Sequence, residues 1–194
     1  TGAIVPVAVI SVIGWWVFEW FNIFLSNWHY ENLVESSWLL YPAYIWSFAT
    51  IIPGIFLLYG VMLTLVGNVS ARPLPVGRRA LTALFLTGLL FLFIPIIPFS
   101  MYYVNRAADA TLFSFLTWAA NTYYSEFTAA FVWLGFALLL EPVNFLMGNP
   151  SLLRNMSRGD YRPLVVLGLA GLLCGYLWEF WNYWAHTKWH YTVP

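Results

Sequence analysis

Five long apolar runs set the limits on what this chain can fold into. They cover roughly residues 3–26, 38–66, 80–104, 126–148 and 163–186. Each run exceeds the roughly 20 residues that a helix needs to cross the hydrocarbon core of a bilayer. None alternates over about ten residues as a membrane barrel strand does, and lipid admits only helices and closed barrels. The sequence therefore predicts an all-α, multi-pass bundle of about five transmembrane helices.

Composition agrees with this class and excludes others. Of the 194 residues, 61% are hydrophobic and only 8% are charged, whereas soluble domains average about 25% charged residues. The formal net charge is zero, and the eight basic residues form no stripe along a helix, which argues against nucleic acid as a partner. The single cysteine, Cys174, excludes an intramolecular disulfide and a cysteine-rich metal site.

The charges between the apolar runs predict the orientation of the helices. Segments 67–79 and 149–162 together hold six arginines and a single acid. Segment 27–37 holds two glutamates and neither Lys nor Arg, and segment 105–125 holds one arginine and one aspartate. Basic loops stay in the cytoplasm. We therefore expect an integral protein of the bacterial cytoplasmic (inner) membrane, with its N-terminus inside and its C-terminus outside.

Two local features refine this topology. Segment 110–122 is apolar but too short to span the membrane, and we expect a separate interfacial or re-entrant helix there, on the outer side. Proline removes a backbone hydrogen-bond donor and bends helices. Bends are therefore predicted at the prolines within or near the ends of the apolar runs, which are Pro42, Pro53, Pro95 and Pro98.

Three glutamates interrupt the apolar runs, and each is followed three residues later by asparagine. The pairs are Glu19 with Asn22, Glu141 with Asn144, and Glu179 with Asn182. Residues three apart share a helix face, so each pair is expected to point together into the bundle. One further turn extends these faces to Ser26, Gly148 and His186.

Such side chains need a role, because an ionisable group at mid-membrane costs at least ~2.5–3.5 kcal/mol. In the structural interpretation, a protonated glutamate shares hydrogen bonds with asparagine between helices. In the functional interpretation, the pairs form a site for a ligand, a proton or a substrate. The sequence leaves both open.

Two of the pairs lie in similar segments. "FEWFNIFLSNWHY" (18–30) and "WEFWNYWAHTKWHY" (178–191) both place Glu and Asn three residues apart and then end in Trp-His-Tyr. The pattern predicts an internal repeat in which spans 1 and 5 are parallel neighbours with Glu19 and Glu179 at similar depth. Sites often lie at the interface of such repeats. Another span follows the first copy only, so residues 1–194 are expected to form one transmembrane domain of a longer chain.

Aromatic residues make up 21% of the chain. Those at the ends of the spans fit an aromatic belt, whereas four tryptophans lie deeper: Trp16, Trp20, Trp178 and Trp181. These four either pack in the interior, or line a pocket for a flat or polyene ligand and stabilise a developing positive charge. His186 and His190 have the i, i+4 spacing of a metal pair but no clear third ligand. No metal or haem site is therefore predicted.

Several stretches resemble a known family. "GWWVFEWFN" with "NWHY", "LEPVNFLMGNPSLL", and "LLCGYLWEFWNYW" with "KWHYTVP" resemble an uncharacterised family of bacterial multi-pass membrane proteins. The resemblance covers most of the chain and implies a chain that extends beyond both ends of this one. The tryptophan and acid pattern is also similar to the membrane-embedded lycopene cyclase type of carotenoid enzyme, which uses acids near prolines, as in Glu141 and Pro142. The Pro-x-Glu-Glu motif of that type is absent here.

Three hypotheses for the function follow. In the first, the protein binds an apolar, isoprenoid-like or lipid ligand and acts on it by acid–base chemistry, which needs no cofactor. Its catalytic groups would be Glu19, Glu179 and Glu141, and its ligand-binding residues would be Asn22, Asn182, Asn144, His186, Trp16, Trp20, Trp178 and Trp181. In the second, the protein is a non-catalytic subunit of a membrane complex, with partner membrane subunits. In the third, it is a proton-coupled transporter. Membrane lipids are partners in all three.

Overall fold

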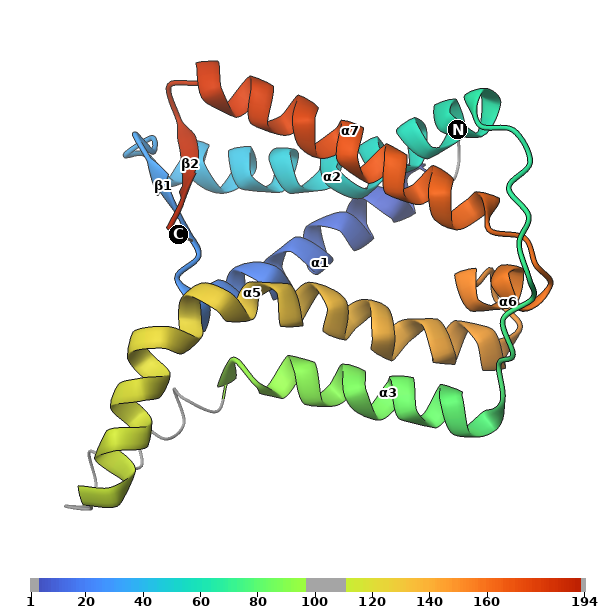
Figure 1. Cartoon of the computed structure of the whole chain (residues 1–194). Coiled ribbons are helices and arrows are strands. Elements are labelled where there is room, and N and C mark those ends of the chain that lie inside the picture. The colour runs from blue at the N-terminus through green and yellow to red at the C-terminus, as the bar shows by residue number, and fades with distance from the viewer. Residues whose placement is uncertain (1–3, 97–110, 193–194) are drawn as a thin grey trace. The chain divides into compact units, whose positions relative to one another are not determined.

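A computed structural model of the chain describes residues 4–96 and 111–192 (Figure 1). The described chain is mostly helical, as the apolar runs predict, with two short strands. Its elements are α1 (Ile4–Leu25), β1 (Trp28–Glu31), α2 (Ser37–Leu65), α3 (Arg78–Phe93), α5 (Thr111–Met147), α6 (Leu152–Ser157), α7 (Arg162–Trp184) and β2 (Lys188–Tyr191).

Four helical segments are long and apolar enough to cross a membrane, in agreement with an integral membrane protein. They are Ile4–Ile23, Ser37–Leu65, Thr128–Met147 and Arg162–Trp184. The remaining predicted span, 80–104, is described only as far as residue 96, and α3 within it has 16 residues. The fifth span therefore stays a prediction, because residues 97–104 lie outside the described part of the chain.

The segment 110–122 is not a separate helix. From residue 111 onward it belongs to α5, which runs without interruption for 37 residues to Met147. The prediction of a short helix that ends before span 4 is thus wrong. The segment contains no proline or glycine, so nothing in its sequence ends the helix before the next apolar run begins.

The chain divides into two compact units. The first lies within Thr1–Glu19, Tyr30–Pro73 and Asn155–His190, and the second includes Trp20–His29 and Leu74–Arg154. In the first unit α7 packs along α2, and in the second α3 packs along α5. The helix that packs along α7 is therefore α2, and the arrangement of spans 1 and 5 as neighbours stays a prediction.

Gly88 allows a close approach in the second unit, whereas Gly54 of the first unit lies at an ordinary van der Waals distance from its neighbour. In the second unit, a Cβ atom added at Gly88 of α3 would lie 2.5 Å from the backbone nitrogen of Leu139 in α5. In the first unit, a Cβ added at Gly54 of α2 would lie 3.6 Å from Cη2 of Trp178 in α7. Small residues bring membrane helices together because dispersion and hydrogen bonding, not the hydrophobic effect, drive their association in lipid.

Ser11 joins α1 to α2 by entering the hydrogen-bond ladder of α2. Its buried hydroxyl donates to the carbonyl oxygen of Phe48 and accepts from the N–H of Ile52, with a distance of 3.0 Å for the second bond. In a regular helix these two backbone groups would bond to each other. Pro53 follows immediately, and a side chain inserted beside a proline is a recognised cause of a helix bend. Figure 1 shows α2 changing direction along its length.

At one end of the first unit, the arginine-bearing segments lie together. The N–H of Ala71 donates to the carbonyl of Gly159 at 3.0 Å, and the N–H of Tyr161 donates to the carbonyl of Val69 at 2.9 Å. Gly159 has φ +80°, and a Cβ there would lie 2.8 Å from the carbonyl oxygen of Ala71. Both its conformation and its surroundings therefore require glycine at this turn.

Arginines cap the helices that end near these segments. Arg162 donates to the last carbonyls of α2, from Nε to Val66 at 3.0 Å and from the guanidinium to Leu63. In the second unit, Arg154 donates to the carbonyl of Phe145 near the end of α5 and lies over its ring. Cations are favourable at helix C-termini, where unbonded carbonyls gather. Two of the arginines that predict the orientation therefore also stabilise helix ends.

Candidate functional site

The two Trp-His-Tyr stretches form the strands β1 and β2, which pair in a two-stranded sheet. In the first unit, the hydroxyl of Thr187 donates to the carbonyl of Asn32 at 2.8 Å. In the second unit, the N–H of Thr192 donates to the carbonyl of Asn27, also at 2.8 Å. Early residues of one strand region thus match late residues of the other, so the strands are antiparallel. The chain segments that follow α1 and α7 therefore lie side by side.

Asn22 holds the backbone that follows α1. Its Oδ1 accepts from the N–H of Asn27 at 2.8 Å and from the N–H of Trp28 at 3.3 Å, while its Nδ2 donates to the carbonyl of Trp28 at 2.8 Å. One side chain thereby satisfies three backbone groups at the start of β1. An asparagine near a helix end commonly bonds to nearby backbone in this way.

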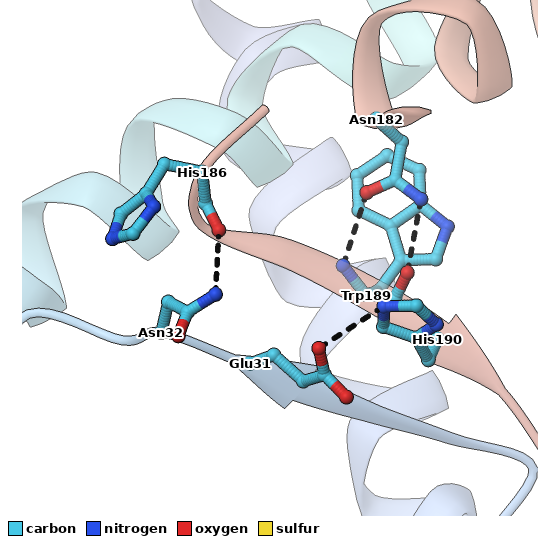
Figure 2. A network of polar contacts seen from close by, with 6 residues as sticks. All are labelled: Glu31, Asn32, Asn182, His186, Trp189 and His190. Carbon is cyan, nitrogen blue, oxygen red and sulfur yellow. Dashed lines mark hydrogen bonds and ion pairs between the residues drawn. The ribbon is translucent and has the colours of Figure 1, made fainter. Parts of the chain in front are cut away.

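Asn182 does the same for the segment after α7 (Figure 2). Its Nδ2 donates to the carbonyl of Trp189 at 2.9 Å, and its Oδ1 accepts from the N–H of Trp189 at 3.0 Å. The side chain is buried, with 8% of the residue exposed. Both asparagines therefore connect the last turns of a helix to the tryptophan of the following Trp-His-Tyr stretch.

The predicted polar faces do not extend by a further turn, because the helices end first. Ser26, Gly148 and His186 lie beyond the last residues of α1, α5 and α7. Ser26 has φ 49° and Gly148 has φ +80°. Such left-handed residues commonly follow a helix C-terminus. These three residues therefore do not continue the Glu-Asn faces as helical positions.

Glu19 lies half-buried near the end of α1 and accepts two hydrogen bonds within the first unit. Nε1 of Trp15, one turn earlier, donates to Oε1 at 3.2 Å. The hydroxyl of Tyr30 in β1 donates a short hydrogen bond to the same oxygen. The phenol thus ties the strand back onto the helix that precedes it. Hydrogen bonds to an ionised acceptor are about twice as strong as neutral ones.

Aromatic rings surround this carboxylate. Tyr30 lies with its ring centroid 5.6 Å from that of Tyr44 in α2, and Tyr44 stacks on Phe48 at 5.6 Å. Trp16 meets Phe48 edge to face at 5.7 Å. Such offset and edge-to-face contacts are the favoured arrangements of aromatic pairs. We call the set the Glu19 cluster; its members are Trp15, Trp16, Glu19, Tyr30, Tyr44 and Phe48.

Burial differs sharply across the Glu19 cluster. Phe48, which also accepts the Ser11 hydroxyl through its carbonyl, is only 4% exposed. Trp16 is 44% exposed. The cluster therefore combines a buried ring on α2 with a half-exposed ring on α1.

Glu179 has a different environment. It is exposed near the end of α7 and accepts one hydrogen bond, 3.2 Å long, from Nε1 of Trp189. The prediction that this glutamate points into the bundle is wrong for the described chain. The two glutamates thus bond to different residues of their own segments, Tyr30 and Trp15 in one case and Trp189 in the other.

Glu141 lies in the second unit and caps α6. Its carboxylate accepts from the hydroxyl of Ser151 at 2.8 Å and from the N–H groups of Leu152 and Leu153, both at 3.3 Å. Carboxylates are favourable at helix N-termini because they bond to N–H groups that lack a partner within the helix. Asn144 accepts at Oδ1 from Asn149 at 3.5 Å. These bonds give the Glu141 pair a structural role, and a catalytic role for Glu141 stays a prediction.

The four deep tryptophans do not share one environment. Trp16 belongs to the Glu19 cluster, and Trp178 is half-buried against Gly54 of α2. Trp181 is 65% exposed and contacts Phe180 of its own helix. Trp20 is exposed in the second unit and contacts Phe21. Of the four, Trp16 is the one with described ring contacts to Tyr44 and Phe48 of α2.

His190 lies in β2, and His186 lies in the short segment between α7 and β2. His190 forms an ion pair of 3.1 Å with Glu31 of β1, and His186 contributes its backbone carbonyl to Asn32 at 3.1 Å (Figure 2). Within residues 4–96 and 111–192, no three His, Cys, Asp or Glu side chains are placed to hold a metal ion.

Sequence reasoning missed Tyr30 and Trp15 as partners of Glu19, because it assigned the tyrosine to the interfacial belt. The available signals were positional. Trp15 is one helical turn before Glu19, and Tyr30 ends the first Trp-His-Tyr stretch. Comparison of the chain with protein-family models, with curated proteins and with solved structures gave no match.

Proposed function

We propose that this integral membrane protein binds an apolar, isoprenoid-like or lipid ligand at the Glu19 cluster. The observation that carries the proposal is a half-buried carboxylate among aromatic rings, with one ring, Trp16, open at the edge. Small-molecule sites are mostly apolar and aromatic, with a few polar groups that fix orientation. The Glu19 cluster has this composition.

The same carboxylate is suited to proton transfer. The hydroxyl of Tyr30 donates a hydrogen bond to Glu19, so the phenol and the carboxyl group lie next to each other. Cyclisation or isomerisation of a polyene requires a positioned proton donor and π faces that stabilise the cation formed. The Glu19 cluster offers both groups. We therefore extend the proposal from ligand binding to acid–base conversion of the bound ligand.

The test begins with the protein purified from its native membrane in a mild detergent. Mass spectrometry of the co-purified small molecules should detect an apolar ligand in the wild type. Trp16→Leu removes a half-exposed ring of the cluster and should reduce the amount of ligand, whereas the control Leu57→Ala, on an exposed part of α2, should not. A wild-type protein that retains no molecule beyond bulk membrane lipid would contradict the proposal.

The acid–base form needs its own variant. Glu19→Gln keeps the shape and an acceptor oxygen but removes the transferable proton. If conversion occurs, the ligand that this variant still binds should remain unconverted. Identical product from Glu19→Gln and wild type would limit the function to binding.

A second candidate is a non-catalytic subunit of a membrane complex, and the surface of α2 favours it. Trp38 and Trp46 are 91% and 77% exposed, and Phe48 is the buried residue of this 29-residue helix. Either lipid or partner helices cover such a surface. Photocrosslinkers placed at Trp46 should capture a defined protein in native membranes if this candidate is correct, and lipid alone if it is not.

A further inference from the structure

We propose that the ligand of the Glu19 cluster carries an ammonium group attached directly to its apolar chain. This inference rests on the proposed function and specifies the chemistry of its ligand. Three observations carry it: the pairing of a carboxylate with aromatic faces, the distribution of charge in the first unit, and the depth of Glu19 along α1.

The first observation is chemical. Ammonium groups are recognised by aromatic faces together with a carboxylate, and the cation–π part strengthens when water is excluded. Trp16 and Tyr44 supply rings whose centroids lie 6.5 Å apart in an edge-to-face arrangement. Glu19 supplies the anion, and a carboxylate accepts about four hydrogen bonds in total. A neutral chain end would gain from the rings but not from the charge.

The second observation is electrostatic. The strand end of the first unit holds Glu19, Glu31 and Glu179, with Lys188 as its basic residue among the described positions. The arginines of this unit lie at the opposite end: Arg162 caps the end of α2, and Arg72 and Arg158 lie in the two segments paired there. A cation is attracted to the strand end, whereas an anionic head group finds no arginine within its described residues.

The third observation is depth. Glu19 is six residues before Leu25, where α1 ends, which corresponds to about 9 Å at ~1.5 Å rise per residue. Tyr44 is seven residues after Ser37, where α2 begins, or about 10 Å by the same rise. The predicted spans place the ends of α1 and α2 at the membrane surface, so the cluster is expected below the level of lipid phosphates. An ammonium beyond a phosphate would remain above it, whereas one attached to the chain itself can reach it.

The experiment compares three probes with one chain length and different ends. Dodecyltrimethylammonium has the cation on the chain, dodecylphosphocholine has it beyond a phosphate, and dodecanol is neutral. Each is added below its micelle concentration to the full chain in dodecyl maltoside, and bound molecules are counted by native mass spectrometry. The trimethylammonium probe should bind tightest, and Glu19→Gln should weaken it by about tenfold or more, as expected for loss of a charged partner.

Two further variants keep the test decisive. Glu35→Gln removes an exposed acid from the same outer segment and should leave the order of the probes unchanged. Trp16→Leu removes a half-exposed ring without opening the interior, and should weaken the trimethylammonium probe more than dodecanol. If Glu19→Gln does not fold, Trp16→Leu alone decides the question.

The outcomes separate this inference from the proposed function. Equal binding of dodecanol and the trimethylammonium probe, lost in Trp16→Leu, would overturn the ammonium chemistry but retain an apolar site. Tighter binding of dodecylphosphocholine would overturn the argument from depth. Absence of binding by every probe, together with no co-purified ligand, would overturn both.

Discussion

The segments 18–30 and 178–191 share a pattern but use their glutamates differently. In each, asparagine bonds to the backbone of the tryptophan that begins the next Trp-His-Tyr stretch, through Asn22 in one and Asn182 in the other. Glu19, however, is half-buried and bonded to Tyr30, whereas Glu179 is exposed and bonded to Trp189.

The difference shows which part of the pattern is local. Asparagine reaches backbone only six or seven residues ahead, so its role depends on the segment alone. The environment of glutamate depends on which helix packs beside it. α2 brings Tyr44 and Phe48 next to the first segment's aromatic residues, whereas the described hydrogen-bond donor to Glu179 is Trp189 of its own segment.

The largest expected effect concerns the side of the membrane on which the two segments lie. Single cysteines replacing Glu35 and Thr187, one beyond each segment, should react with an impermeant maleimide added to intact cells. Cysteines replacing Val76 and Ser157 should react only after permeabilisation, because the arginine-bearing segments are predicted to be cytoplasmic. Cys174 is buried and serves as the background thiol. Labelling of position 76 or 157 in intact cells would invert the topology.

The next comparison removes the asparagines. Asn182→Ala leaves the N–H and C=O of Trp189 without their partner in a buried site, and should lower the free energy of unfolding by about 2–3 kcal/mol. Asn22→Ala should cost about 1–2 kcal/mol, since Asn22 is less buried. Asn149→Ala is the control, because its side chain is exposed and its hydrogen bond is 3.5 Å long. Unfolding by SDS in mixed micelles measures all three, and an unchanged Asn182→Ala would refute the shared role.

A third test separates the two glutamates. Glu19→Ala leaves the Tyr30 hydroxyl and the Trp15 indole without an acceptor, and should lower the free energy of unfolding by about 1–2 kcal/mol. Glu179→Ala should change it by less than about 0.5 kcal/mol, as exposed substitutions usually do. The same micelle titration applies. Equal losses for the two variants would mean that Glu179 is covered in the membrane, by lipid or by another chain.

The smallest effect should come from the ion pair that joins the two strand regions. Glu31 and His190 are 3.1 Å apart, with side chains 45% and 46% exposed. Exposed pairs contribute about 0–1 kcal/mol, so Glu31→Gln should change stability by no more than this. Whatever effect exists should shrink in high salt, because exposed charges are screened. A larger, salt-independent loss would show that the strands depend on each other more than on their own asparagines.

Sequence reasoning predicted the helical class and four of the described spans, because about 20 apolar residues in lipid have few other folds available to them. It also placed Asn22 and Asn182 as equivalent positions. It failed at segment 110–122, where hydropathy marks lipid exposure and not the end of a helix: α5 simply begins at Thr111 and continues. It failed again for the further helical turn, because left-handed residues such as Ser26 end the helices.

The sequence by itself therefore determined that the protein belongs in a lipid bilayer and which segments are apolar and long enough to span it. It also determined the short-range hydrogen bonds of each asparagine. These follow from hydropathy and from reach along one segment. Only the tertiary structure decided that α2 packs along α7, that Ser11 enters the ladder of α2, and that Glu19 is half-buried whereas Glu179 is exposed. In a bilayer, an apolar helix face can contact either lipid or another helix at similar cost. Hydropathy therefore does not determine which helices pack together. Small residues and a few hydrogen bonds choose them instead.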